Sequence, residues 1–344
     1  MRRTLSFFCA LLVLGSAFAG LGPIPGTQRV TPIFESADLV CNCYVESLRT
    51  LKEQKLERAG KPFTQRHVVA KVRVNDPYNK QVQIGTEINV AFEEEIPTTK
   101  PMPTLSEAET ALIFLKVSSP SLYEFADRFM GATPFASLAV QNERPGLSKL
   151  QSALAAVLQQ GSGNDQINAM RLLEGFDELS PETLRSVGAL SDSADADTAL
   201  SSIAVLLKAK QPGSVKRLES YLRIHKASPA PMAVLSIGEE LGQVTDIEDL
   251  APLETLTSSE LLSIRLGAMA GVRKMRNPHS AQVLVERLDD PNADIRFLAV
   301  ITLSEIFSKT GDYAPNMGLF DQNPEFYTIK WKTWWNENRE NLSR

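Results

Sequence analysis

Five alanines recur in the second half of the sequence at nearly constant intervals. Residues Ala169, Ala199, Ala233, Ala268 and Ala299 are separated by 30, 34, 35 and 31 residues. A leucine, isoleucine or valine follows each alanine four residues later, which places both side chains on one helix face. The small residue lets a neighbouring helix approach, and the aliphatic residue fills the space between the two. The spacing therefore predicts stacked helix pairs of about 30 to 35 residues each.

The last two of these repeats are the most similar to each other. The segment Ile-Arg-Leu-Gly-Ala at 264–268 returns as Ile-Arg-Phe-Leu-Ala at 295–299, after an acidic turn at 288–294. This pattern resembles the HEAT-like repeats first described in phycobilisome lyases, although the repeats around Ala169 and Ala199 lack the arginine. The resemblance covers residues 147–310 and implies an α–α solenoid there. Turn or helix-start signals lie between the predicted helices: Pro181-Glu182, Pro212-Gly213, Pro229-Ala230, Asn277-Pro278 and Pro291-Asn292.

The first half of the sequence alternates with period two instead. The clearest stretch is 67–74, where Val68, Ala70, Val72 and Val74 share one face of a half-buried strand. Four further strands are predicted at 39–51, 82–92, 111–117 and 122–129, with a turn at 76–79 and a proline-rich loop at 97–103. Five strands in about 90 residues suit a small closed barrel, which we place at residues 30–135.

Four short segments of this half resemble the OB-like barrels of exported proteins that are related in outline to the netrin and tissue-inhibitor modules. They are Ala-Asp-Leu-Val at 37–40, Ala-Lys-Val-Arg-Val at 70–74, Gly-Thr-Glu-Ile-Asn-Val at 85–90 and Glu-Thr-Ala-Leu-Ile-Phe-Leu at 109–115. The resemblance covers roughly residues 36–130. Tissue inhibitors insert an amino-terminal cysteine into a metalloprotease, and the mature end expected here has none. Inhibition of that type is therefore not implied.

The N-terminus has the three parts of a secretory signal. Arg2 and Arg3 precede an apolar run at 5–14, and the small-residue motif Ala-Phe-Ala at 17–19 predicts cleavage after Ala19. The expected location is therefore periplasmic or secreted. Cleavage changes the formal charge from −5 to −7, which argues against a nucleic-acid partner. No segment of the mature chain is long and apolar enough to predict a membrane span.

Residues 311–344 are predicted to be a linker followed by a tryptophan-rich helix that caps the helix array. Trp331 and Trp335 share one face of this helix, whereas Trp334 lies off it. The favoured interpretation is that all three tryptophans pack on the last repeat as a cap. The alternative is an aromatic patch that faces a partner, and Trp334 is the best candidate for it.

Arg265 and Arg296 occupy equivalent places in the last two repeats and are the other candidates for partner binding. The favoured alternative is structural. In that case they pair with acidic residues of the turn, such as Asp289, Asp290 or Asp294, and keep adjacent repeats in register.

Cys41 and Cys43 are two residues apart on a predicted strand, so their side chains point to the same face. Three interpretations remain open: a strained local disulfide, two buried thiols, or a redox or metal pair. A catalytic pair normally has the spacing Cys-x-x-Cys, so the first two interpretations are favoured.

The sequence contains no catalytic, nucleotide-binding or metalloprotease motif. Its three histidines, His67, His225 and His279, are far apart, and the acidic group at 192–197 lacks the glycine and the closing glutamate of a calcium loop. We therefore predict no catalytic residue, no cofactor and no metal.

Together these features predict a multidomain chain with both α and β structure, in which a five-stranded OB-like barrel precedes a HEAT-like solenoid. The predicted function is that of an exported scaffold that binds a partner protein and is not an enzyme. Two alternatives are kept: binding of an extracellular polymer or ligand by the barrel, and a lyase-like or enzyme-accessory role.

Overall fold

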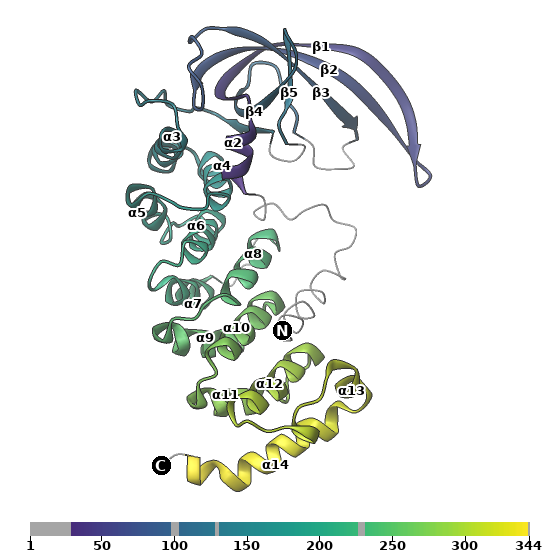
Figure 1. The fold of residues 1–344 in the computed structure, drawn as a ribbon, viewed down its shortest axis with the longest axis vertical. Coiled ribbons are helices and arrows are strands. Elements are labelled where there is room, and N and C mark those ends of the chain that lie inside the picture. The colour runs from purple at the N-terminus through teal and green to yellow at the C-terminus, as the bar shows by residue number, and fades with distance from the viewer. Residues whose placement is uncertain (1–28, 98–102, 128–130, 226–230, 343–344) are drawn as a thin grey trace. The chain divides into compact units, whose positions relative to one another are not determined.

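The computed structural model describes residues 29–97, 103–127, 131–225 and 231–342. It forms two compact units, one ending at Val187 and the other beginning at Gly188 (Figure 1). The first unit contains the sheet and the helices that follow it, and the second is helical. The predicted signal at 1–19 lies outside the described residues. In the described part of the chain, every helix is too short or too polar to cross a bilayer.

The sheet has six strands, one more than the sequence predicted. The sixth strand is short, includes Pro134 and pairs with the edge of the fourth, so its composition gave no strand signal. The first two strands are also much longer than expected and form one extended hairpin. The strands are β1 (Leu39–Arg58), β2 (Lys61–Pro77), β3 (Glu87–Ile96), β4 (Thr110–Ser119), β5 (Leu122–Phe125) and β6 (Ala132–Phe135).

Five of these strands are joined in a ring of hydrogen bonds. The order runs β1-β2-β3-β5-β4, and β4 pairs again with β1. β3 and β5 are parallel, and the other pairs are antiparallel. The ring is not a regular barrel, because β1 pairs with β4 only from Leu39 to Tyr44 while its hairpin with β2 extends to Arg58. The structure thus differs from the predicted five-stranded closed barrel in strand number and in regularity.

The core of the sheet follows the predicted alternation. Val68, Ala70, Val72 and Val74 of β2 are all buried in one apolar cluster, with Cys41, Cys43 and Val45 of β1. Period-two burial on one face of a sheet is the pattern that selects strand over helix. The strand predicted for this segment is therefore confirmed.

Four helices accompany the sheet in sequence. They are α2 (Val30–Ser36), α3 (Leu147–Gln160), α4 (Gly163–Glu174) and α5 (Pro181–Ala189), which ends just past the unit boundary. Polar contacts fasten α4 to the last strand, since the Ala136 N–H donates to the Asp165 carboxylate at 3.0 Å and the Asn168 amide donates to the Pro134 carbonyl at 3.0 Å. The Val30 N–H donates to the Gly175 carbonyl, which ties α2 to the end of α4.

The second unit consists of helices that pack in two rows. α6 contacts α8, α8 contacts α10, α10 contacts α12, and α12 contacts α14, while α7 contacts α9. Each helix of the first row thus packs on the next but one in sequence. The helices are α6 (Ala196–Lys208), α7 (Ser214–Ile224), α8 (Pro231–Leu241), α9 (Leu250–Leu256), α10 (Leu262–Met275), α11 (Ala281–Arg287), α12 (Ala293–Ile306), α13 (Met317–Gln322) and α14 (Pro324–Leu342).

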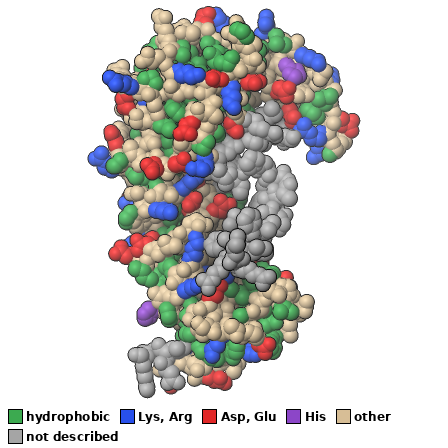
Figure 2. Space-filling view, viewed as in Figure 1, with side chains coloured by type: hydrophobic (Ala, Val, Ile, Leu, Met, Phe, Trp, Pro, Cys, Tyr) green, Lys and Arg blue, Asp and Glu red, His purple; other side chains and the backbone are tan. Residues whose placement is uncertain are grey.

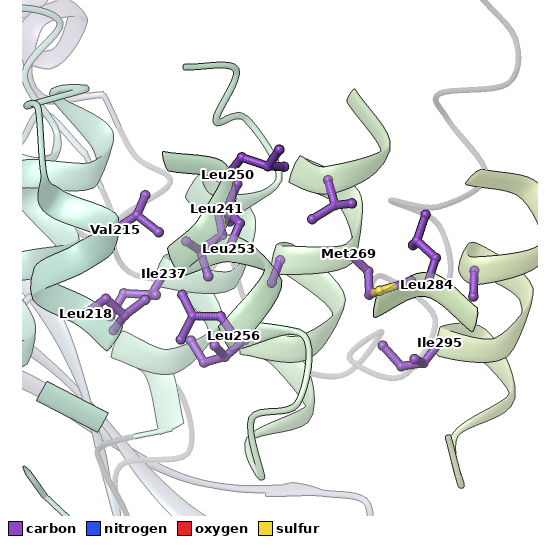
Figure 3. Close-up of a cluster of buried hydrophobic side chains, with 14 of the residues drawn as sticks. Val215, Leu218, Ile237, Leu241, Leu250, Leu253, Leu256, Met269, Leu284 and Ile295 are labelled. Atoms are coloured by element: carbon purple, nitrogen blue, oxygen red, sulfur yellow. The ribbon is translucent and has the colours of Figure 1, made fainter. Parts of the chain in front are cut away.

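The repeating alanines lie where the sequence predicted close packing. Four of the five have no exposed surface, and Ala233 is partly buried against the core. The aliphatic residue four positions later is buried in every case. In the second unit these side chains belong to one continuous apolar cluster that runs from α6 to α14, part of which is drawn in Figure 3.

Two helices of the first row approach each other through glycine. A Cβ atom added to Gly267 on α10 would lie 2.1 Å from the carbonyl oxygen of Gly238 on α8. One turn further along, a Cβ on Gly271 would lie 2.7 Å from the Leu241 carbonyl oxygen. Backbone atoms cannot rotate away as a side chain can, so only glycine fits at these points.

Candidate functional site

Arg265 and Arg296 make the same contacts in two successive repeats. The Nη1 of Arg265 donates to the carbonyl oxygens of Ser259, at 2.6 Å, and of Glu260, at 3.3 Å. The Nη1 of Arg296 donates to the carbonyl oxygens of Asp290, at 2.7 Å, and of Pro291, at 3.1 Å. In both cases the acceptors lie six and five residues before the arginine. Each guanidinium therefore satisfies backbone oxygens of the turn that precedes its own helix.

The turn between α11 and α12 brings the two arginines together at Asp290. The Nε of Arg265 lies 3.2 Å from one carboxylate oxygen of Asp290, and the carbonyl of Asp290 accepts from Arg296. Asp290 is buried, and its other carboxylate oxygen accepts from the Asn292 N–H at 2.9 Å. This carboxylate is one of those predicted to pair with the arginines.

These contacts bear on the two roles considered for the arginines. The Arg265 side chain is only 13% exposed, and its guanidinium joins α10 to the turn that precedes α12. Arg296 uses the same nitrogen for the turn of its own repeat. Both thus form intramolecular contacts that order the helix array, and any contact with a partner protein stays a prediction.

Trp334 lies on α14, in an aromatic group at the end of the core. Its ring centroid is 4.7 Å from that of Phe307 and 5.4 Å from that of Trp331, which it meets edge to face. The ammonium of Lys309 lies 5.2 Å from the Trp334 ring. Trp331 is fully buried and donates its Nε1–H to the Tyr313 carbonyl at 2.9 Å. Trp334 therefore shares the capping position with its neighbours and keeps part of its surface exposed.

Cys41 and Cys43 are free thiols with no exposed surface, and both side chains face the sheet core. Removal from water disfavours the thiolate, so the pKa of Cys43 is raised to about 12 and that of Cys41 is also raised. A neutral, inaccessible thiol is a poor nucleophile.

The other polar residues considered in the sequence have local partners. His67 lies 3.2 Å from Glu93, and His225 stacks on Tyr221. Asp195 caps α6 by accepting from the Thr198 side chain and N–H, and these hydrogen bonds lower the pKa of its carboxyl group. Within the described segments, no three His, Cys, Asp or Glu side chains are grouped so as to hold a metal.

Sequence analysis missed a buried polar cluster between the sheet and α3. Lys149 and Asp76 form an ion pair with side chains 6% and 1% exposed, and Lys149 also donates to the Pro77 carbonyl at 2.9 Å. The second carboxylate oxygen of Asp76 accepts from the Gln141 N–H at 3.0 Å. The Lys149 ammonium lies 5.6 Å from the Tyr78 ring.

Asp76 lies near the end of β2 and Tyr78 directly follows the strand, where the sequence predicted only a turn. Desolvation, and then the nearby Asp76 carboxylate, raise the pKa of Tyr78, so its hydroxyl is neutral. Asn42, which faces Asp76 across β1 and β2, donates its amide to the Leu138 carbonyl at 3.1 Å. The cluster therefore fixes residues 138–149, the connection between sheet and helices, against the ends of both strands. The only signal of this cluster in the sequence was Asn42, a polar residue inside an apolar strand segment.

One set of equivalent positions in the second unit is open to solvent. The residue two positions after each repeat alanine is partly exposed in all four row helices: Ser201 on α6, Leu235 on α8, Ala270 on α10 and Ile301 on α12. Positions of the same phase on consecutive packed helices lie side by side. This strip of small and aliphatic residues is here called the row surface. In Figure 2, acidic and basic side chains are interspersed over the face shown.

No protein-family model matches the chain, and no curated protein is significantly similar to it.

Proposed function

We propose that the protein is an exported scaffold and that its row surface binds a partner protein. The observation that supports this most is the recurrence of one partly exposed position on α6, α8, α10 and α12. Because each helix of the row packs on the next, such positions form an extended strip rather than a compact pocket. Extended strips of this kind suit the surface of a protein better than that of a small molecule.

The proposal includes the finer architecture that the sequence resemblance implies. The matched contacts of Arg265 and Arg296 and the two rows of helices favour a HEAT-like solenoid at residues 147–310. The ring formed by β1, β2, β3, β5 and β4 favours an OB-like barrel at 30–135, with β6 added at its edge. Neither part is proposed to be catalytic.

The polymer-binding alternative has less support. It needs aromatic side chains exposed on the sheet, and the strands offer chiefly Tyr44 and Tyr123, which are already engaged. The Arg73 guanidinium lies 5.6 Å from the Tyr44 ring, and Tyr123 packs against the sheet core. No contact in the structure favours the lyase-like alternative over the scaffold.

The test places a photo-crosslinking amino acid at single positions of the full-length chain, expressed in its own host. Leu235, Ala270 and Ile301 sample the row surface. Arg223 on α7 and Glu286 on α11, which is 52% exposed, are the controls on the other row. We expect one partner protein to be crosslinked from at least two of the three row positions and from neither control.

Crosslinks that form equally from both rows, or from none of the row positions, would contradict the proposal. The export part has a separate readout. Sequencing the N-terminus of the chain purified from the periplasm or culture fluid is expected to give Gly20 as the first residue. An uncleaved chain retained in the cytoplasm would contradict it.

A further inference from the structure

The long hairpin leaves one edge of β1 without a neighbouring strand. β4 pairs with β1 only as far as Tyr44. Beyond it, Val45 exchanges backbone hydrogen bonds with Glu109 and Ala108, and the Leu48 N–H donates to the Glu107 carboxylate at 2.8 Å. From Lys52 to Arg58, β1 pairs with β2 in unbroken register, without a bulge. Over residues 49–57 no strand among the described residues pairs with the outer edge of β1. Every second N–H and C=O there is open to an added strand.

This edge is basic. Arg49, Lys52 and Lys55 are exposed, and in the described parts of the chain no carboxylate lies within ion-pair distance of them. The acidic side chains nearby are used inside the hairpin. Glu53 pairs with Arg66 at 2.8 Å, and the Arg66 Nη1 also lies 3.5 Å from Glu94. Only Glu57 on the edge offsets the three cations, so the edge has a net positive charge.

The acidic groups of β3, which pairs with β2, are likewise engaged. Glu95 pairs with Arg58 at 2.9 Å, and Glu93 lies 3.2 Å from His67. These carboxylates already have partners, so an excess of cations remains along the open edge of β1.

We propose that residues 49–57 of β1 bind an extended acidic segment of a partner protein by strand addition. The open backbone groups hydrogen-bond to the added strand, while Arg49, Lys52 and Lys55 attract its carboxylates. A second copy of this chain is a poorer occupant, because two β1 edges that pair symmetrically both have a net positive charge. This site lies in the first unit and is independent of the row surface on the helices.

The probe is a fluorescent peptide of about eight residues that alternates glutamate with threonine and valine, titrated with the full-length chain at low salt. Two further peptides separate the contributions. One has lysine in place of each glutamate, and the other keeps glutamate but has N-methyl groups on alternate backbone nitrogens. We expect the acidic peptide to bind, and each altered peptide to bind at least about tenfold more weakly.

The protein variants are Lys52→Glu/Lys55→Glu and the matched control Lys216→Glu/Arg223→Glu. The control reverses two exposed cations on α7, so the net charge changes equally. We expect about tenfold or greater loss of peptide affinity in the first variant and little change in the second. Equal loss of peptide affinity in both variants would mean that the net charge of the chain, and not the edge of β1, determines binding. That result, undiminished binding of the N-methylated peptide, or failure of the acidic peptide to bind would each overturn the proposal.

Discussion

The sheet unit and the helical unit differ in how far apart in the sequence a charged side chain and its bonding partner are. In the helical unit, Arg265 and Arg296 bond to carbonyls six and five residues earlier, and the link between repeats spans only 25 residues, from Arg265 to Asp290. In the sheet unit, Lys149 reaches Asp76, 73 residues away, and both charges are buried. Charged side chains in the helical unit thus have local contacts that recur, and those of the buried pair in the sheet unit have long-range contacts that do not.

The largest expected effect comes from breaking the buried pair of the sheet unit. Lys149→Met leaves the Asp76 carboxylate buried without its cation, which is expected to lower the free energy of unfolding by about 4 kcal/mol. The double variant Asp76→Asn/Lys149→Met buries no net charge and is expected to be more stable than the single one. Denaturant unfolding of both variants measures the difference. A double variant less stable than Lys149→Met would show that the pair does not act as a unit.

The next effect concerns the closest approach in the helical unit. Gly267→Ala adds a Cβ atom 2.1 Å from the Gly238 carbonyl oxygen, and forcing α8 and α10 apart is expected to cost about 3 kcal/mol. Gly188→Ala on α5 is the control, because no atom lies within 4 Å of its added Cβ. Helix propensity predicts that this control gains about 0.5 to 1 kcal/mol. Thermal unfolding of the two variants checks the contrast, and equal effects would mean that the helices are not closely packed there.

The repeated arginine contacts predict similar effects in two repeats. Arg265→Met is expected to cost about 2 kcal/mol and Arg296→Met about 1.5 kcal/mol, since Arg265 also pairs with the buried Asp290. Urea unfolding of each variant provides the measurement. If one substitution is neutral while the other is severe, the two repeats are not equivalent.

The smallest effect is the pH dependence of the free energy of unfolding that the Cys43 thiol of the sheet unit causes. Because the pKa of Cys43 is raised from 9.0 to about 12 in the folded chain, the unfolded chain ionises first. The stability from this thiol is complete below pH 9 and falls between pH 9 and pH 12, by about 1.4 kcal/mol at pH 10. Replacing Cys43 with alanine is expected to flatten this pH dependence. An unchanged slope in the variant would assign the alkaline loss to other groups.

The sequence was sufficient where contacts repeat locally. The spacing of the five alanines predicted the packed face of each helix, and the alternation at 67–74 predicted the face of β2 that is buried. Both predictions depend on a period that neighbouring residues define, so no knowledge of distant segments was needed.

Features set by distant segments were not predictable in this way. The length of the hairpin, the sixth strand and the bonding of Asp76 to Lys149 depend on pairing across tens of residues, and β6 in addition contains a proline. For the candidate site, the sequence favoured pairing of the arginines with acidic turn residues, and Arg265 does pair with Asp290. The bonds from both guanidinium groups to turn carbonyls were not predictable in this way. The row surface could be identified only from the structure, because it is defined by which residues of each helix are buried and which are partly exposed.

In the proposed architecture, α6, α8, α10 and α12 are successive copies of one packing unit in a line. Pulsed electron–electron resonance between spin labels at Ser201, Leu235, Ala270 and Ile301 tests it directly, because Cys41 and Cys43 are buried and stay unlabelled. With about 10 Å between neighbouring helices, the 201–270 and 235–301 pairs are expected near about 20 Å and the 201–301 pair near about 30 Å. A 201–301 distance no longer than the other two would show a compact bundle and contradict the account.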